Sequence, residues 1–189
     1  MLGPRTAKEG TASALAVYCL TLIPLALILP DQFLAGSPAL SAAVSAVGKV
    51  AGSVEALGSV SAFPDRTRTV LALCWVMCPF LTAWVYLGLL SDRAAILAHY
   101  QRLRWKLVFL LPVISYALIY IPVSMHLLDP AKAERGRSFF YIVVGAASHK
   151  PLGLAVLSSA FGFTVSVTTA LVVYCLVNTR PILLQENIQ

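Results

Sequence analysis

Apolar residues gather in four long runs, and the segments before, between and after them carry all of the Asp, Glu, Lys and Arg residues. The runs cover residues 12–30, 69–90, 107–128 and 152–177. A helix of about 20 apolar residues crosses a hydrocarbon core about 30 Å thick, so each run predicts a transmembrane helix. Too little polar sequence remains to cover four such helices in a soluble protein. The predicted fold class is therefore an all-α integral membrane protein with four spans.

The first run also shares features with a secretory signal peptide. Arg5 and Lys8 precede it, and small residues follow it. Its apolar stretch is longer than the roughly 7 to 15 residues of a signal peptide's apolar region, so we expect an uncleaved anchor.

The segment between the first two runs, residues 37–63, is rich in small side chains. Ser37 and Pro38 are typical of a helix N-cap and first helical position. An apolar stripe then recurs at helical spacing, made of Leu40, Val44, Val47, Val54 and Leu57. The pattern predicts one helix over about residues 38–62.

Two charges decide where this helix is expected to lie. Lys49 and Glu55 fall in its interior, and a charge near the bilayer centre costs about 2.5 to 3.5 kcal/mol on insertion scales. We therefore expect an extramembrane or interfacial helix. Gly48 and Gly52 would let another helix approach closely, although with Gly58 they also leave a flexible linker as an alternative.

Composition and charge agree with a membrane protein. The chain is 59% hydrophobic and 12% charged, with a net charge of +6 and a mean hydropathy of +0.82. The basic residues flank the runs rather than forming a patch with interleaved aromatics, so we expect no nucleic-acid partner and favour anionic lipid headgroups. The predicted headgroup anchor is the group Arg102, Arg104, Trp105 and Lys106.

The distribution of basic residues predicts the orientation. Seven basic residues fall on each side of a four-span protein, so the raw count is a tie. The shortest and most basic connection, residues 91–106, is placed in the cytoplasm by the positive-inside rule. This places the N-terminus (1–11) and the tail (178–189) in the cytoplasm and the loop 129–150 outside. We expect the inner membrane of a bacterium.

Cys74 and Cys78 lie four residues apart in the second run, on one face of a helix. The three histidines sit at or outside the ends of the runs, and a disulfide within one regular helix has unfavourable geometry. We therefore expect packing roles for these cysteines, and neither a metal site nor a cofactor. The sequence contains no GxSxG, HExxH or phosphate-loop motif, so we do not expect an enzyme.

The fourth run carries a stripe of small residues. They recur every four positions: Ser158, Gly162, Ser166 and Ala170. Such a stripe lets a neighbouring helix pack closely. The predicted function is a structural or accessory subunit of a membrane complex, associating with other subunits or with itself through this stripe and the 37–63 helix.

One alternative belongs to another functional class. The Ser and Thr side chains of the fourth run, among them Thr164 and Thr168, form a face that can line a polar pathway. A homo-oligomeric pore or a small transporter is therefore the second hypothesis, and a membrane enzyme that depends on histidine the third.

Overall fold

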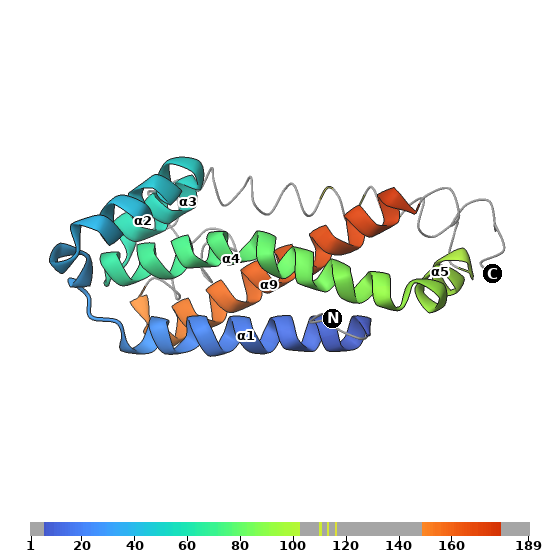
Figure 1. The fold of residues 1–189 in the computed structure, drawn as a ribbon. Coiled ribbons are helices and arrows are strands. Elements are labelled where there is room, and N and C mark those ends of the chain that lie inside the picture. The colour runs from blue at the N-terminus through green and yellow to red at the C-terminus, as the bar shows by residue number, and fades with distance from the viewer. Residues whose placement is uncertain (1–5, 103–109, 111–112, 114–115, 117–148, 179–189) are drawn as a thin grey trace. The chain divides into compact units, whose positions relative to one another are not determined.

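The computed structural model describes residues 6–102, 110, 113, 116 and 149–178, and every regular element in these ranges is a helix (Figure 1). Three helices of the described ranges are long and apolar enough to cross a membrane: α1 (Ala7–Ile28), α4 (Pro64–Ser91) and α9 (Pro151–Val177). The shorter elements are η1 (Phe33–Gly36), α2 (Pro38–Val50), α3 (Gly52–Val60) and α5 (Arg93–Arg102). A fourth candidate exists if α2 and α3 together count as one broken span.

The first helix begins at Ala7 rather than at residue 12, because one local and one long-range cap extend it beyond the apolar run. The Thr6 hydroxyl accepts a hydrogen bond from the Glu9 amide at 3.0 Å, as an N-cap residue does. The Asp92 carboxylate accepts a second bond, from the Ala7 amide at 2.8 Å. These acceptors satisfy amides that the first turn of a helix otherwise leaves unpaired.

The fourth helix begins at Pro64 rather than at residue 69. Proline suits the first helical position because its fixed φ matches the helix and its missing amide is not needed there. The Thr67 amide already bonds the Phe63 carbonyl at 3.0 Å. As a result Asp65, Arg66 and Arg68 belong to α4 rather than to a loop.

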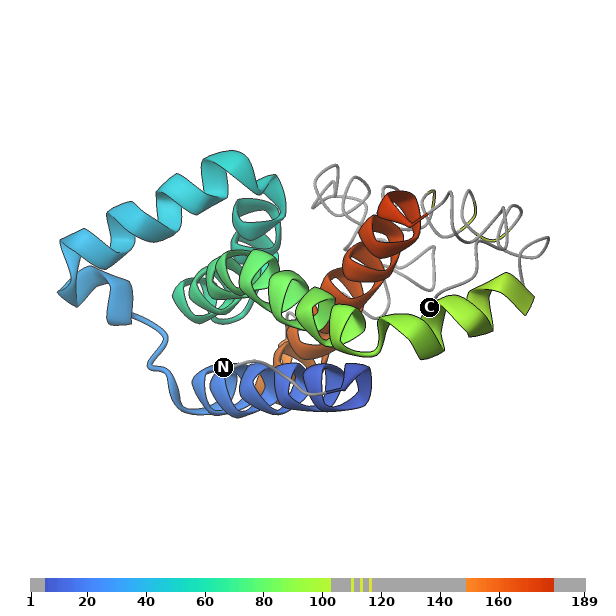
Figure 2. The ribbon, with the colours of Figure 1, turned by 45° about the vertical axis from the view of Figure 1, so that its right-hand side comes forward.

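The expectation of one helix over residues 38–62 is wrong, because α2 and α3 are separate helices bent by 112° (Figure 2). Ala51 leaves the helical conformation, with φ −109° and ψ 80°. Its amide closes α2 on Val47 and its carbonyl opens α3 toward Val54. The helix start at Pro38 is confirmed, although the Ser37 side chain makes no capping hydrogen bond within the described part of the chain.

The third apolar run, 107–128, lies outside the described residues apart from Leu110, Val113 and Tyr116. The same holds for the loop 129–150 up to residue 148, and for the tail 178–189 beyond Asn178. The predictions for these segments therefore stay predictions.

The chain divides into two compact units. The first comprises Met1–Ala16, Pro79–Ile121 and Phe163–Gln189, and the second comprises Val17–Cys78 and Pro122–Gly162. The apolar stripe predicted for residues 38–62 faces the core of the second unit. The buried core residues there are Leu34, Val44, Ala51, Val54, Leu57, Leu71 and Ala72, with Leu40 and Val47 packed against them.

Two contacts within the second unit set the direction of α1 against α4. Tyr18 meets Cys74, and the Ala26 carbonyl meets Arg66. Because residue numbers rise along α1 from Tyr18 to Ala26 while they fall along α4 from Cys74 to Arg66, these parts of α1 and α4 are antiparallel. The end of α1 therefore lies beside the start of α4.

Candidate functional site

The predicted stripe on α9 meets α1 and α4 at a buried tyrosine. Tyr18 donates a hydrogen bond from its hydroxyl to the Ser158 carbonyl at 3.1 Å. The same hydroxyl lies 2.6 Å from the Sγ atom of Cys74. The Cys74 Sγ atom is 3.7 Å from the Ser158 carbonyl oxygen. Tyr18, Cys74 and Ser158 are fully buried, so this is a buried crossing of three helices.

The second cysteine repeats this contact one helical turn further along. Cys78 Sγ lies 3.7 Å from the Gly162 carbonyl oxygen, as Cys74 Sγ does from that of Ser158. A step of four residues along α4, from Cys74 to Cys78, thus matches a step of four along α9, from Ser158 to Gly162. Because residue numbers rise in the same direction on both helices, α4 and α9 are parallel at this contact. The cysteine pair packs against the small-residue stripe, in agreement with the packing role expected from the sequence.

Gly162 sits at the tightest point of the crossing. A Cβ atom built there would lie 1.6 Å from the Tyr18 hydroxyl oxygen and 2.8 Å from Cys74 Sγ. No side chain fits in that space without moving its neighbours. The glycine is therefore required for the close approach of α9.

The rest of the stripe is also buried. Ser166 and Ala170, in the first unit, are fully buried, as Ser158 is in the second. Ser158 and Gly162 pack against α1 and α4 of the same chain. The association of this stripe with another subunit stays a prediction.

Gly48 and Gly52 lie on either side of the bend between α2 and α3. A Cβ atom at Gly48 would meet the Glu55 Oε1 atom at 2.9 Å. Gly52 is the first residue of α3 and is half-buried. The buried Gly48 thus allows the close approach of α3 to α2, again inside the chain.

Arg102, of the predicted anchor, is exposed at the end of α5, whereas Arg104, Trp105 and Lys106 lie outside the described residues.

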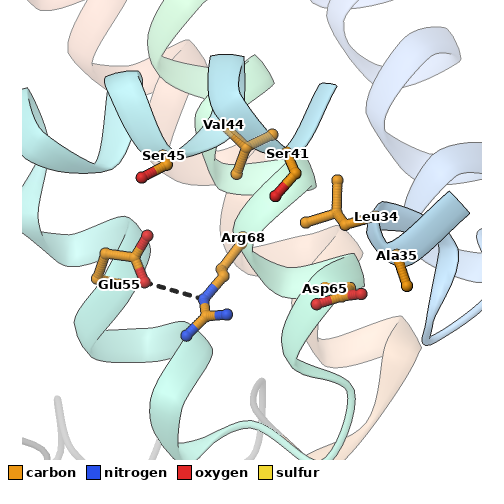
Figure 3. A pocket seen from close by; sticks show the side chains of 8 residues that line it. All are labelled: Leu34, Ala35, Ser41, Val44, Ser45, Glu55, Asp65 and Arg68. Atoms are coloured by element: carbon orange, nitrogen blue, oxygen red, sulfur yellow. Dashed lines mark ion pairs between the residues drawn. The ribbon is translucent and has the colours of Figure 1, made fainter. Parts of the chain in front are cut away.

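A polar pocket of about 350 Å³ lies among α2, α3 and the start of α4 (Figure 3). Arg68 reaches across it to Glu55, with 3.0 Å between Nε and the carboxylate. Gly58 makes room for this arginine, because a Cβ atom there would lie 2.5 Å from its Cγ atom. Ser41 and Ser45 face the same space from α2.

Asp65 is the unpaired charge of this pocket. Among the described residues its carboxylate has neither a hydrogen bond nor an ion pair. With Glu55 and Arg68 neutralising each other, the pocket keeps one net negative charge and suits a cationic group. The sequence pattern does not reveal this pocket, because Glu55 of α3 and Arg68 of α4 come together only in the tertiary structure.

A second ion pair ties the end of α1 to the start of α4. Arg66 lies 2.7 Å from the Asp31 carboxylate, donates to the Ala26 carbonyl at 3.4 Å and covers the Phe63 ring at 5.2 Å. These contacts lie within the second unit. They hold the two chain ends of the η1–α2–α3 segment together.

We expect Asp31→Asn to lower the free energy of unfolding by less than about 1 kcal/mol, because exposed ion pairs contribute little and Asp31 is 56% exposed. Arg66→Ala should cost more, since it also removes the carbonyl bond and the ring contact. Unfolding midpoints in mild detergent test this order. The reverse order would show that the ion pair dominates.

In the first unit, Tyr174 is the centre of an aromatic cluster. Its ring centroid lies 6.2 Å from that of Tyr86 and 6.5 Å from that of Tyr100. Its hydroxyl donates to the Arg93 carbonyl at 3.5 Å. Burial, with Cys175 and Tyr174 nearby, raises the pKa of Tyr100 on α5 to about 12. The cluster ties α4, α5 and α9 together by packing.

Within residues 6–102 and 149–178, no three His, Cys, Asp or Glu side chains gather where they could hold a metal ion. The buried crossing joins helices, and the polar pocket offers charge and hydroxyl groups for binding. No protein family, no curated protein and no solved structure matches the chain.

Proposed function

We propose that the protein is an accessory subunit of a larger membrane assembly, and that it crosses the membrane four times. Three spans correspond to α1, α4 and α9, and the fourth to residues 107–128. The direction of the helices supports this count. Because α4 and α9 are parallel where Cys74 and Cys78 meet α9, the chain between them has to cross the membrane once more.

The proposed orientation follows from the basic residues. An even number of spans puts both termini on one side, and the connection 91–106 has the highest density of basic residues among the short loops. We place this connection and both termini in the cytoplasm, and we assign the protein to a bacterial inner membrane. Arg102, exposed at the end of α5, then lies where anionic headgroups are available.

The observation that carries the subunit proposal is the outer face of α2. Five of its eight exposed positions carry small side chains, namely Ala39, Ala42, Ala43, Ser45 and Ala46, and the other three are Pro38, Lys49 and Val50. A face of small side chains gains little from lipid contact but lets a helix of another chain approach closely. We name Ala39, Ala42, Ala43 and Ala46 the α2 alanine face and propose that it binds a partner subunit.

The test is native mass spectrometry of the tagged chain, extracted from its own host's membranes in a mild detergent. We expect co-purification with different chains at fixed stoichiometry. Ala42→Leu with Ala46→Leu should weaken this association by about tenfold or more, because two leucines hold the partner helix away, and tenfold corresponds to about 1.4 kcal/mol.

The matched control is Ala83→Leu, an exposed alanine on α4, which should leave the association unchanged. A homo-oligomer without other chains would favour the pore hypothesis, and a monomer would contradict both. The burial of Ser158 and Ser166 and the bond from the Ser158 hydroxyl back to the Leu154 carbonyl at 2.7 Å support packing over a polar pathway along α9.

A further inference from the structure

The two ends of the η1–α2–α3 segment meet at one end of the second unit. Asp31, just after α1, pairs with Arg66 in the first turn of α4 at 2.7 Å, and Arg66 also bonds the Ala26 carbonyl at 3.4 Å. The chain from residue 32 to residue 65 therefore leaves and returns at the same end of these helices. If α1 and α4 span the membrane, α2 and α3 together do not form a single crossing.

The length of the segment leads to the same conclusion. α2 has 13 residues and α3 has 9, and they bend by 112°. At 1.5 Å per residue, the distance from the start of α2 to the end of α3 is about 19 Å. A hydrocarbon core is about 30 Å thick, so the pair is too short to cross it.

The bend nevertheless lies beside the apolar part of α4. The Trp75 indole donates to the Ser53 hydroxyl at 3.3 Å, and Ala51, Trp75 and Val76 line one groove. Trp75 follows Arg68, the last charged residue before the apolar run of α4, by seven positions, which is about 10 Å along the helix. The tip of the α2–α3 pair therefore lies beside the apolar part of α4, about 10 Å along the helix from its charged end.

The residues that line the α2–α3 pair change from charged to apolar between the start of α4 and the tip of the pair. Glu55, Asp65 and Arg68 line the pocket near the start of α4, whereas the groove at the tip, of about 380 Å³, is lined only by apolar residues and Trp75. They are Ala46, Val47, Val50, Ala51, Trp75 and Val76. Val50, the last residue of α2, is 84% exposed. An exposed apolar tip is unfavourable in water and favourable among acyl chains.

The two interior charges do not oppose this placement. Glu55 is paired with Arg68, so it does not enter as an isolated charge. Lys49 lies in the last turn of α2, where the helix dipole favours a cation, and its long side chain can extend toward the headgroups.

We propose that α2 and α3 form a re-entrant hairpin, which enters the hydrocarbon core and leaves it on the same side, with Val50, Trp75 and Val76 of the groove against lipid acyl chains. This inference rests on the proposed membrane insertion of α4. It replaces the extramembrane or interfacial helix expected from the sequence. It also means that the α2 alanine face meets its partner partly within the membrane.

Spin labels on single introduced cysteines test the depth of the tip in reconstituted vesicles. Val50→Cys reports the tip, and Phe80→Cys reports α4, where Phe80 is 72% exposed. Gly36→Cys and Ala62→Cys report the two ends of the segment, and the wild-type chain measures the background from the native cysteines. We expect the labels at 50 and 80 to collide with oxygen and to lose most collisions with a water-soluble nickel complex.

A membrane-impermeant maleimide tests sidedness in sealed vesicles of known orientation. Gly36→Cys and Ala62→Cys should react from the same side. Reaction from opposite sides would overturn the hairpin in favour of a broken span. A water-exposed label at 50 with a lipid-exposed label at 80 would overturn the hairpin alone, whereas water exposure at both would overturn the membrane insertion on which it rests.

Discussion

Gly162→Leu is expected to lower the free energy of unfolding by about 3 kcal/mol or more, at the upper end of the range for overpacked cores. A Cβ atom alone would lie 1.6 Å from the Tyr18 hydroxyl oxygen and 2.8 Å from Cys74 Sγ. Tyr18 and Cys74 are fully buried, so neither moves aside without displacing a helix. The unfolding midpoint in mild detergent measures the effect.

Gly36→Ala is the control, because a Cβ atom at Gly36 meets nothing within 4 Å. It should change stability by less than about 0.5 kcal/mol. The double variant Tyr18→Ala with Gly162→Leu should lose less stability than the sum of the two single losses, because removal of the Tyr18 side chain also removes the clash. A Gly162→Leu protein as stable as the wild type would show that α1, α4 and α9 do not meet closely here.

Tyr174→Ala should destabilise the first unit by about 2 to 4 kcal/mol. Removing a buried aromatic ring in a soluble core costs about 3 to 5 kcal/mol, and we expect somewhat less in a membrane because lipid is as apolar as the core. Tyr174 is fully buried, between the rings of Tyr86 and Tyr100. The same unfolding experiment gives the cost.

Tyr174→Phe keeps the ring and loses only the 3.5 Å hydrogen bond to the Arg93 carbonyl, so it should cost under about 1 kcal/mol. Val177→Ala, at a position 66% exposed on the same helix, controls for side-chain truncation. If Tyr174→Phe proves as harmful as Tyr174→Ala, the hydroxyl rather than the ring holds α5 and α9 together.

The limits of α1 and α4 show why helix ends are harder to predict than helices. The apolar runs at 12–30 and 69–90 identified both helices, since the length of an apolar run is a local property of the chain. Their starts depend on caps. Thr6 and Glu9 form a local capping pattern, whereas Asp92 caps Ala7 from far along the chain.

The bend at Ala51 had no clear local signal. The segment contains no proline after Pro38, and its glycines at 48 and 52 were compatible with a helix or a linker. The contacts that accompany the bend come from other elements. Arg68 pairs with Glu55, and Trp75 bonds Ser53. A sequence pattern does not contain such long-range pairs.

The sequence by itself determined that the chain is helical, that three of its described helices are long and apolar enough to span a membrane, and that α9 carries a packing stripe. These properties depend on apolar run length and on a repeat of four, which are both local. The tertiary structure alone decided that Ser158 and Gly162 meet Tyr18, Cys74 and Cys78 of the same chain. The physical reason is that a stripe of small residues packs equally well against any close helix, so its partner is selected by long-range contacts and not by the stripe.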